Sequence, residues 1–170
     1  MRPRTRIAPA FPMPNQRIKT PCIGLCSTVY GDLVCRGCKR FHHEVVNWNL
    51  YGEEEKRAVW QRLEALLVQV VAAKLEVFDA QLLRRQLEQR QIRYAPQQSP
   101  YCWAYQLITR GARVIQQVEA YGIVLLPEFR DSGLPELRDA IDREYFLLSE
   151  AHYQRYIAPR FLVDGVDYRV

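Results

Sequence analysis

Four cysteines near the start of the chain form two close pairs whose spacing suits metal binding. They follow the pattern C-x3-C-x8-C-x2-C, and they are Cys22, Cys26, Cys35 and Cys38. Two pairs joined by a short turn can direct four sulfur atoms to one point, as tetrahedral Zn²⁺ or an iron–sulfur cluster requires. Thiolates are soft ligands, so they favour zinc, copper(I) or iron–sulfur chemistry over magnesium or calcium. The sequence therefore predicts a metal site at these residues.

The spacing leaves the identity of the metal open. Two ligand pairs, the second of which leads directly into a helix, are typical of compact zinc fingers. The eight residues between the pairs are fewer than most zinc patterns contain. A thiol redox enzyme that uses Cys35 and Cys38 is a further alternative, and it requires one thiol of low pKa.

No other motif supplies catalytic residues. Glycine-rich nucleotide loops, the HExxH pattern and the GxSxG elbow are all absent from the sequence. The fifth cysteine, Cys102, has no sequence neighbour that would lower its pKa, so we expect a small buried apolar side chain there. No residue is assigned a catalytic role, and a role other than catalysis is favoured.

Short elements must bring the two cysteine pairs together. Apolar residues on either side of Gly31-Asp32 predict a small hairpin between the pairs. Residues 41–48 predict a short helix, and a longer helix begins at Glu53. The apolar positions of the longer helix recur at intervals of three and four, which indicates one buried face. These positions are Trp60, Leu63, Leu66, Leu67, Val70 and Val71.

The remainder of the chain predicts strands and helices in alternation. Residues 74–78 and 92–95 are predicted to be strands, one before and one after a helix capped by Asp79. Together these three elements would form a βαβ-type unit. Residues 103–109 and 122–126 are further candidate strands, and the stretch 114–121 could be helical. A long helix begins near Leu134, with apolar residues on one face as far as His152.

The predicted fold class is α+β: a small four-cysteine metal module with a hairpin and helices, followed by a mixed α/β region that ends in a long helix. With 48% hydrophobic and 25% charged residues, the chain of 170 residues has the composition of a globular protein. We expect three segments: a flexible basic arm (1–20), the metal module with its helix (21–73), and an α+β region of unknown role (74–170).

The net charge of +5 is concentrated at the N-terminal end. Residues 1–41 hold eight Lys and Arg side chains and one carboxylate, Asp32, so they carry +7 and the other 129 residues carry −2. Such a segment attracts acidic partners electrostatically. We therefore expect a nucleic acid or an unknown protein partner at the basic arm.

The location of the protein follows from what its sequence lacks. The first twenty residues contain four prolines and no apolar signal region. No stretch approaches the roughly 18 apolar residues that a membrane span needs. We expect a cytoplasmic protein without a membrane segment. In a reducing compartment, clustered thiols serve as metal ligands more often than as structural disulfides.

The cysteine segment also resembles a known family. The resemblance rests on the cysteines and on the residues around and after them: Pro21-Cys22-Ile23, Cys26, Val34-Cys35-Arg36-Gly37-Cys38, Arg40, Glu44-Val45, Trp48, Glu55-Lys56-Arg57, Trp60 and Leu63. This combination resembles the bacterial domain of unknown function 1289, which is usually labelled a predicted iron–sulfur protein, and it covers residues 21–63. Phe41 and Gly52 depart from the family pattern, since they replace hydroxylated residues that cap helices.

The resemblance implies a cysteine-ligated metal at the same four residues, and it favours an iron–sulfur cluster over Zn²⁺. It supplies no reaction. The resulting hypothesis is a small cytoplasmic iron–sulfur protein with a redox, sensing or structural role. The alternative is a zinc-stabilised module that binds nucleic acid or acts as a protein adaptor.

Overall fold

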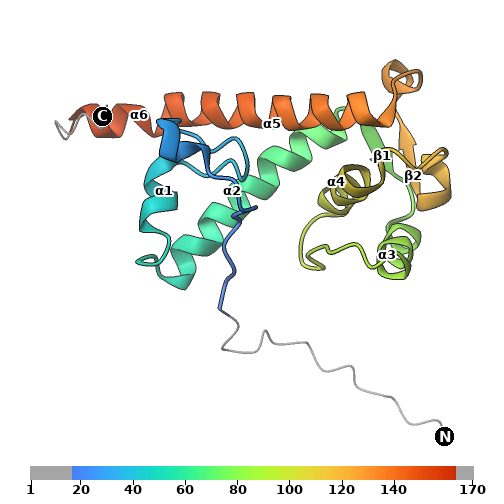
Figure 1. The fold of residues 1–170 in the computed structure, drawn as a ribbon, viewed down its shortest axis with the longest axis horizontal. Helices are drawn as coiled ribbons and strands as arrows, with labels where there is room; N and C mark the ends of the chain where they lie inside the picture. Colours follow the sequence, from blue (N-terminus) through green and yellow to red (C-terminus); the bar gives the residue numbers. More distant parts are fainter. Residues whose placement is uncertain (1–16, 164–170) are drawn as a thin grey trace, which may run out of the picture.

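The long helix α5 (Leu134–Tyr156) runs along one side of the molecule, and α1 to α4 and both strands lie beneath it (Figure 1). The computed structural model describes residues 17–163 of the chain. Most of the predicted basic arm, residues 1–16, lies outside the described residues. In the described part, no helix is both long enough and apolar enough to cross a bilayer.

The cysteine-bearing part contains a short 3-10 turn (Ser27–Tyr30) followed by helix α1 (His42–Asn47). The 3-10 turn takes the place of the predicted hairpin between the cysteine pairs. Val29 and Tyr30 are 73% and 89% exposed, so the apolar residues of this segment have no sheet to pack against. A single bridge forms later, between Val34 and Phe41, around the second cysteine pair.

Helix α2 (Glu53–Ala72) begins at the predicted residue and buries the predicted apolar face, except that Trp60 is only half-buried. Neither α1 nor α2 has a capping side chain at its N-cap. In each helix a glutamate three residues on accepts the N-cap backbone N–H instead: Glu44 from Phe41 at 2.9 Å and Glu55 from Gly52 at 2.7 Å. Phe41 is fully buried, so apolar packing replaces the cap expected there.

The second half contains helices α3 (Ala80–Gln89) and α4 (Pro100–Gly111), strands β1 (Leu75–Val77) and β2 (Ile123–Leu125), and the short helix α6 (Ala158–Val163) after α5. Two 3-10 turns, Val118–Tyr121 and Pro127–Phe129, flank β2. The predicted strand at 122–126 and the helix capped by Asp79 are confirmed.

Two predictions for this half are wrong. β1 pairs antiparallel with β2, with Leu75 opposite Leu125, and residues 92–95 form no strand, so 74–95 is not a βαβ unit. Residues 103–109 lie in α4 rather than in a strand, because Ser99 caps that helix and Pro100 occupies its first turn. The sharp turn into β2 requires Gly122, whose φ is +79° and whose absent side chain would collide with the Asp79 carbonyl.

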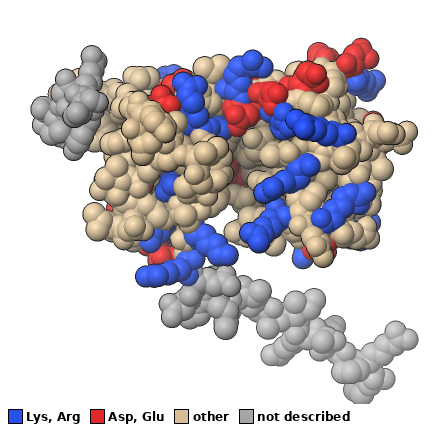
Figure 2. Space-filling view, viewed as in Figure 1, with Lys and Arg blue, Asp and Glu red and all other residues tan. Residues whose placement is uncertain are grey.

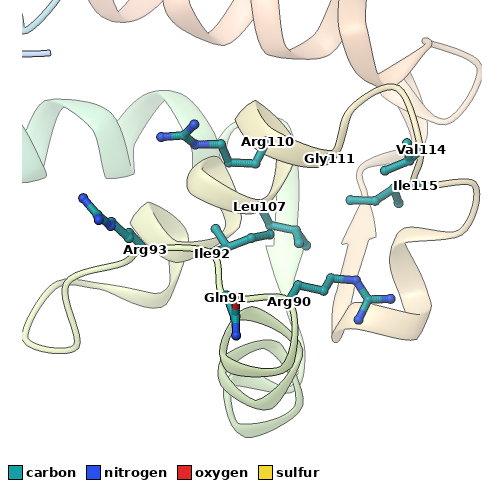
Figure 3. Close-up of a pocket in the computed structure, with 9 residues that line it drawn as sticks. All are labelled: Arg90, Gln91, Ile92, Arg93, Leu107, Arg110, Gly111, Val114 and Ile115. Carbon is teal, nitrogen blue, oxygen red and sulfur yellow. The ribbon is translucent and has the colours of Figure 1, made fainter. Parts of the chain in front are cut away.

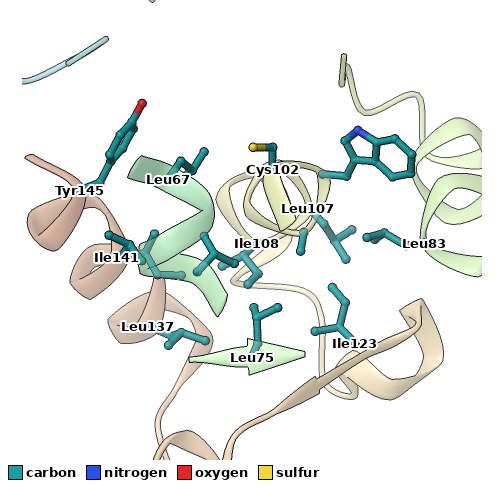
Figure 4. Packing of buried hydrophobic residues seen from close by; sticks show 14 of the residues in the cluster. Leu67, Leu75, Leu83, Cys102, Leu107, Ile108, Ile123, Leu137, Ile141 and Tyr145 are labelled. Carbon is teal, nitrogen blue, oxygen red and sulfur yellow. The ribbon is translucent and has the colours of Figure 1, made fainter. Parts of the chain in front are cut away.

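The main apolar core joins α2, α3, α4, α5 and both strands (Figure 4). Leu67, Leu83, Ile108, Ile123 and Ile141 contribute one side chain from each of five elements. A second, smaller cluster holds the cysteine-bearing part against α5, and it consists of Val34, Phe41, Phe146 and Tyr153. Helices with a small antiparallel sheet confirm the predicted α+β class.

Candidate metal centre

The two cysteine loops lie in direct contact. Gly37, inside the second pair, leaves so little room that an added Cβ would lie 2.7 Å from the Leu25 carbonyl oxygen and 3.0 Å from the Ile23 side chain. The Cys35 Sγ lies 3.7 Å from the same carbonyl oxygen. The first loop therefore rests on the second loop, and only glycine permits this approach.

The four sulfur atoms differ in exposure. Cys35 and Cys38 are 0% and 8% exposed, and their thiols interact with each other. Cys26 is half-buried, with its Sγ 3.0 Å from the Thr28 hydroxyl. Cys22 lies at the surface, where its Sγ accepts the backbone N–H of Gly24.

All four thiols are free, and residues 17–163 contain no group of three or more His, Cys, Asp and Glu side chains spaced to hold a metal ion. The structure thus brings Cys35 and Cys38 together and places the loop that carries Cys22 and Cys26 against them.

Opposing influences act on the pKa of Cys35. Burial raises it, but interactions with the backbone amides of Cys38, Ser27 and Gly37, and with the Cys38 thiol, bring the pKa of Cys35 down to about 7. Burial raises the pKa of Cys38, and Arg40 acts against that rise. The turn between these residues therefore provides donors that stabilise a thiolate.

Arg40 is a buried cation beside a sulfur atom. The residue is 3% exposed, its Nε donates to Cys38 Sγ at 3.3 Å, and its guanidinium lies 5.0 Å from the centre of the Trp48 ring. Within the described part of the chain, it forms no ion pair with a carboxylate. A buried charge needs a counter-charge, and the Cys38 sulfur that accepts from Arg40 would supply one if its thiol were deprotonated.

Lys39 fastens the second cysteine turn to α5. Its backbone has a φ of +60°, and its buried Nζ donates to the carbonyl oxygens of Arg36 at 2.7 Å and Gly37 at 3.2 Å. The same ammonium group forms an ion pair with Asp142 on α5. The position of the second cysteine pair relative to the long helix is therefore fixed by a charged contact.

A second ion pair orients α1. The Arg62 guanidinium on α2 donates through both terminal nitrogens to the Glu44 carboxylate, and it lies 3.8 Å from the centre of the Phe41 ring. Both side chains are largely buried. This contact holds the segment after the last cysteine against α2.

A cavity of about 570 Å³ opens beside the second cysteine turn. Its lining includes Cys38, Lys39, Tyr105, Asp142 and Tyr145. The Tyr145 hydroxyl donates to the Leu63 carbonyl oxygen at 3.0 Å, which ties α5 to α2 at the cavity wall. Figure 2 shows the face of the molecule hollowed between its cysteine-bearing half and the α3/α4 half.

The four cysteines have the donor chemistry of a thiolate-ligated metal centre, although residues 17–163 hold no three such side chains at metal-binding spacing. The donors are four soft sulfurs on two loops in contact, and Gly37 keeps the loops close. A centre with four thiolates carries net negative charge with either Zn²⁺ or a cluster, and Lys39 and Arg40 supply buried positive charge next to it.

Sequence reasoning found the sulfur atoms but missed the roles of Lys39 and Arg40. Both follow the last clustered cysteine directly, and two cations at that position could have indicated a role beside the thiolates. Their buried state depends on Asp142 and Trp48, which no local pattern connects to them.

A comparison with protein-family models matches residues 20–67 to a family described as "Protein of unknown function (DUF1289)". The matched segment begins just before Cys22 and ends within α2, so it contains all four clustered cysteines, Arg40 and the Glu44–Arg62 pair. No curated protein and no solved structure matches the chain.

Proposed function

We propose that this chain, whose residues 20–67 match the family model of domain of unknown function 1289, binds one metal centre through four thiolates. The proposed ligands are Cys22, Cys26, Cys35 and Cys38. The observation that carries the proposal is Arg40, a buried guanidinium whose hydrogen-bond acceptor is Cys38 Sγ and which forms no ion pair with a carboxylate in residues 17–163. A metal-bound thiolate would supply the missing negative charge.

The contact between the loops supports the same ligand set. Cys35 and Cys38 are held in place by the Lys39–Asp142 contact, whereas Cys22 lies on an exposed loop beside them. Metal binding would therefore require the loop that carries Cys22 and Cys26 to move, and it would leave the core unchanged. Such coupling of loop order to metal is common in small metal modules.

We propose an iron–sulfur cluster in preference to Zn²⁺. The sulfur atoms of Cys35 and Cys38 are buried and receive hydrogen bonds. Burial and hydrogen bonding both influence the reduction potential of a cluster. The exposed position of Cys22 would leave the centre near the surface, which suits electron exchange or sensing. With zinc, the role would be structural, in a module that presents the basic arm to nucleic acid or to a protein.

Metal analysis of the full chain, purified without oxygen, tests the proposal. Iron, acid-labile sulfide and a brown visible absorption are expected, and Cys35→Ser should remove all three. Cys102→Ser is the matched control, because Cys102 lies in the main core, and it should leave the metal content unchanged. A colourless protein with one zinc per chain would overturn the choice of iron–sulfur. A metal-free protein would overturn the metal centre itself.

One observation favours a second candidate, a redox-active thiol pair. The lowered pKa of Cys35, to about 7, is what such a pair requires. The burial of both Cys35 and Cys38 works against it, because a partner thiol must reach one of the sulfur atoms. A reversible Cys35–Cys38 disulfide in a metal-free chain, detected by mass spectrometry, would support this alternative.

A further inference from the structure

A cavity of about 660 Å³ lies at the ends of α3 and α4. Its lining residues are far in sequence from the four clustered cysteines. Three arginines line it: Arg90, Arg93 and Arg110 (Figure 3). None of its nine lining residues is acidic. The size is within the range of pockets that hold small ligands or one unit of a larger one.

The positive charges of this cavity are not neutralised. Within the described part of the chain, the side chains of Arg93 and Arg110 form no hydrogen bond and no ion pair. Arg90 contacts only neutral groups, since it donates to Gln86 Oε1 at 2.6 Å and to the Tyr121 hydroxyl at 3.0 Å. Three uncompensated guanidinium groups around one hollow favour an anionic ligand.

The surrounding segment has the same sign of charge. Residues 80–115 contain six arginines and a single acidic residue, Glu88, which gives a net charge of +5. Figure 2 shows Lys and Arg side chains gathered over α3 and α4, whereas acidic side chains lie along α5. A basic field of this extent is suited to a ligand with more than one negative charge.

The floor of the cavity is apolar. It is formed by Ile92, Leu107 and Ile115, with Val114 at 79% exposure on the rim. In Figure 3, Arg93 and Arg110 extend to one side of this floor and Arg90 to the other. Cations on both sides of an apolar surface match a strand whose phosphates flank an unstacked base.

Gln91 lines the cavity in an unfavourable backbone conformation. Its φ of +54° lies in the left-handed region at the end of α3, where glycine is the usual residue. The N–H groups of Gln91 and Ile92 bond to the Glu88 and Leu87 carbonyl oxygens, the pattern of a glycine-terminated helix. A residue that costs stability at the edge of a cavity is a candidate for a binding role.

We infer that this cavity binds single-stranded nucleic acid. The guanidinium groups on its two sides contact successive phosphates, and a base lies on the apolar floor. Phosphate is also present in free nucleotides, and the strand is favoured because the arginines stand on opposite sides of the floor. The inference does not depend on the metal centre.

Fluorescence anisotropy with the full chain tests the inference, with a labelled single-stranded RNA of about twelve nucleotides as probe at two salt concentrations. The double variant Arg93→Gln/Arg110→Gln should bind about tenfold more weakly and show a shallower salt dependence. Arg57→Gln/Arg143→Gln is the charge-matched control, since both residues are exposed outside the cavity, and its affinity should stay within about twofold of the parent chain.

Gln91→Gly is a second variant that separates a loss of binding from a loss of folding. It relieves the left-handed backbone, and it should weaken binding severalfold in a chain that is no less stable. Equal loss of affinity in the charge-matched control would overturn the site, and so would the absence of binding at low salt. Adenosine monophosphate binding as tightly as the strand would overturn the assignment of a strand.

Discussion

At the scale of single residues, the buried charge of Arg40 indicates which charge its neighbouring sulfur atom should carry. Its acceptor is a sulfur atom, and a neutral thiol accepts a hydrogen bond only weakly. A guanidinium in that position is well matched to a thiolate and poorly matched to a thiol. Arg40 therefore belongs to the proposed metal site even though it does not bind the metal.

Replacement of Arg40 by Gln should weaken retention of the metal by about tenfold to a hundredfold, because residues that hold a ligand contribute that much to metal affinity. The measurement is the rate of metal loss to a chelator. Arg36→Gln is the control, since Arg36 is exposed and forms an ion pair with Asp32 at 3.0 Å. Equal rates for the two variants would contradict the role of Arg40.

Cys102 should remain unmodified by iodoacetamide at pH 8 in the folded chain. Burial, with a smaller effect from the charge of Glu64, raises the pKa of Cys102 to about 12. The thiolate is the reactive form, and at that pH only about one Cys102 side chain in ten thousand is ionised at any moment, so labelling is slow. Mass spectrometry should find the label only after unfolding in guanidinium. Labelling of Cys102 in the folded chain would show that the core around it opens.

At the scale of elements, removing one partner of the buried ion pair between α1 and α2 costs more stability than removing one partner of an exposed pair. Glu44→Ala removes the partner of Arg62 and the acceptor of the Phe41 N–H. Loss of one member of such a pair costs about 3–5 kcal/mol of unfolding free energy, which urea denaturation measures. The double change Glu44→Leu/Arg62→Met should recover much of this loss. An equal loss in the double variant would refute the argument from unpaired charge.

The end of α3 offers a stabilising change. Gln91→Gly should raise the free energy of unfolding by about 0.5 to 1 kcal/mol, because glycine adopts the left-handed region without steric cost. Gln89→Gly, at the last residue of the helix, should lower it by a similar amount. Thermal unfolding of both variants checks the pair, and a loss in both would show that the side chain of Gln91 stabilises the fold.

The elements that sequence could predict are those whose pattern is local. α2, α3 and α5 follow from apolar spacing and from Asp79 at a cap. α4 is mistaken for a strand because its aromatic and branched residues favour strands, although its buried residues Trp103, Leu107 and Gly111 recur at helical spacing. The pairing of β1 with β2 joins segments nearly fifty residues apart, and no short-range signal specifies it.

The same limit applies to the candidate site. The four cysteines are adjacent enough in sequence to be recognised as one set. The contact of Lys39 with Asp142 spans 103 residues and exists only because α5 lies against the cysteine turn. Charged side chains brought together by helix packing leave no periodic trace in the sequence.

At the scale of the whole molecule, removal of the metal should loosen one part more than the rest. The main core draws on α2, α3, α4 and α5, and none of the four proposed ligands belongs to it. A chelator should therefore speed hydrogen exchange in residues 21–48 and leave α3 and α4 protected, as mass spectrometry can measure. Loss of protection throughout the chain would contradict this division.

Helix α5 carries Asp142, Phe146 and Tyr153 on the side that meets the cysteine-bearing part. Each residue inserted into an α-helix turns everything beyond it by about 100°. A single insertion or deletion between Asp142 and Tyr153 would rotate the aromatic residues away from Phe41. The length of α5 can therefore change freely only beyond Tyr153, because even seven inserted residues, which restore the rotation, move the residues after them by about 10 Å along the helix.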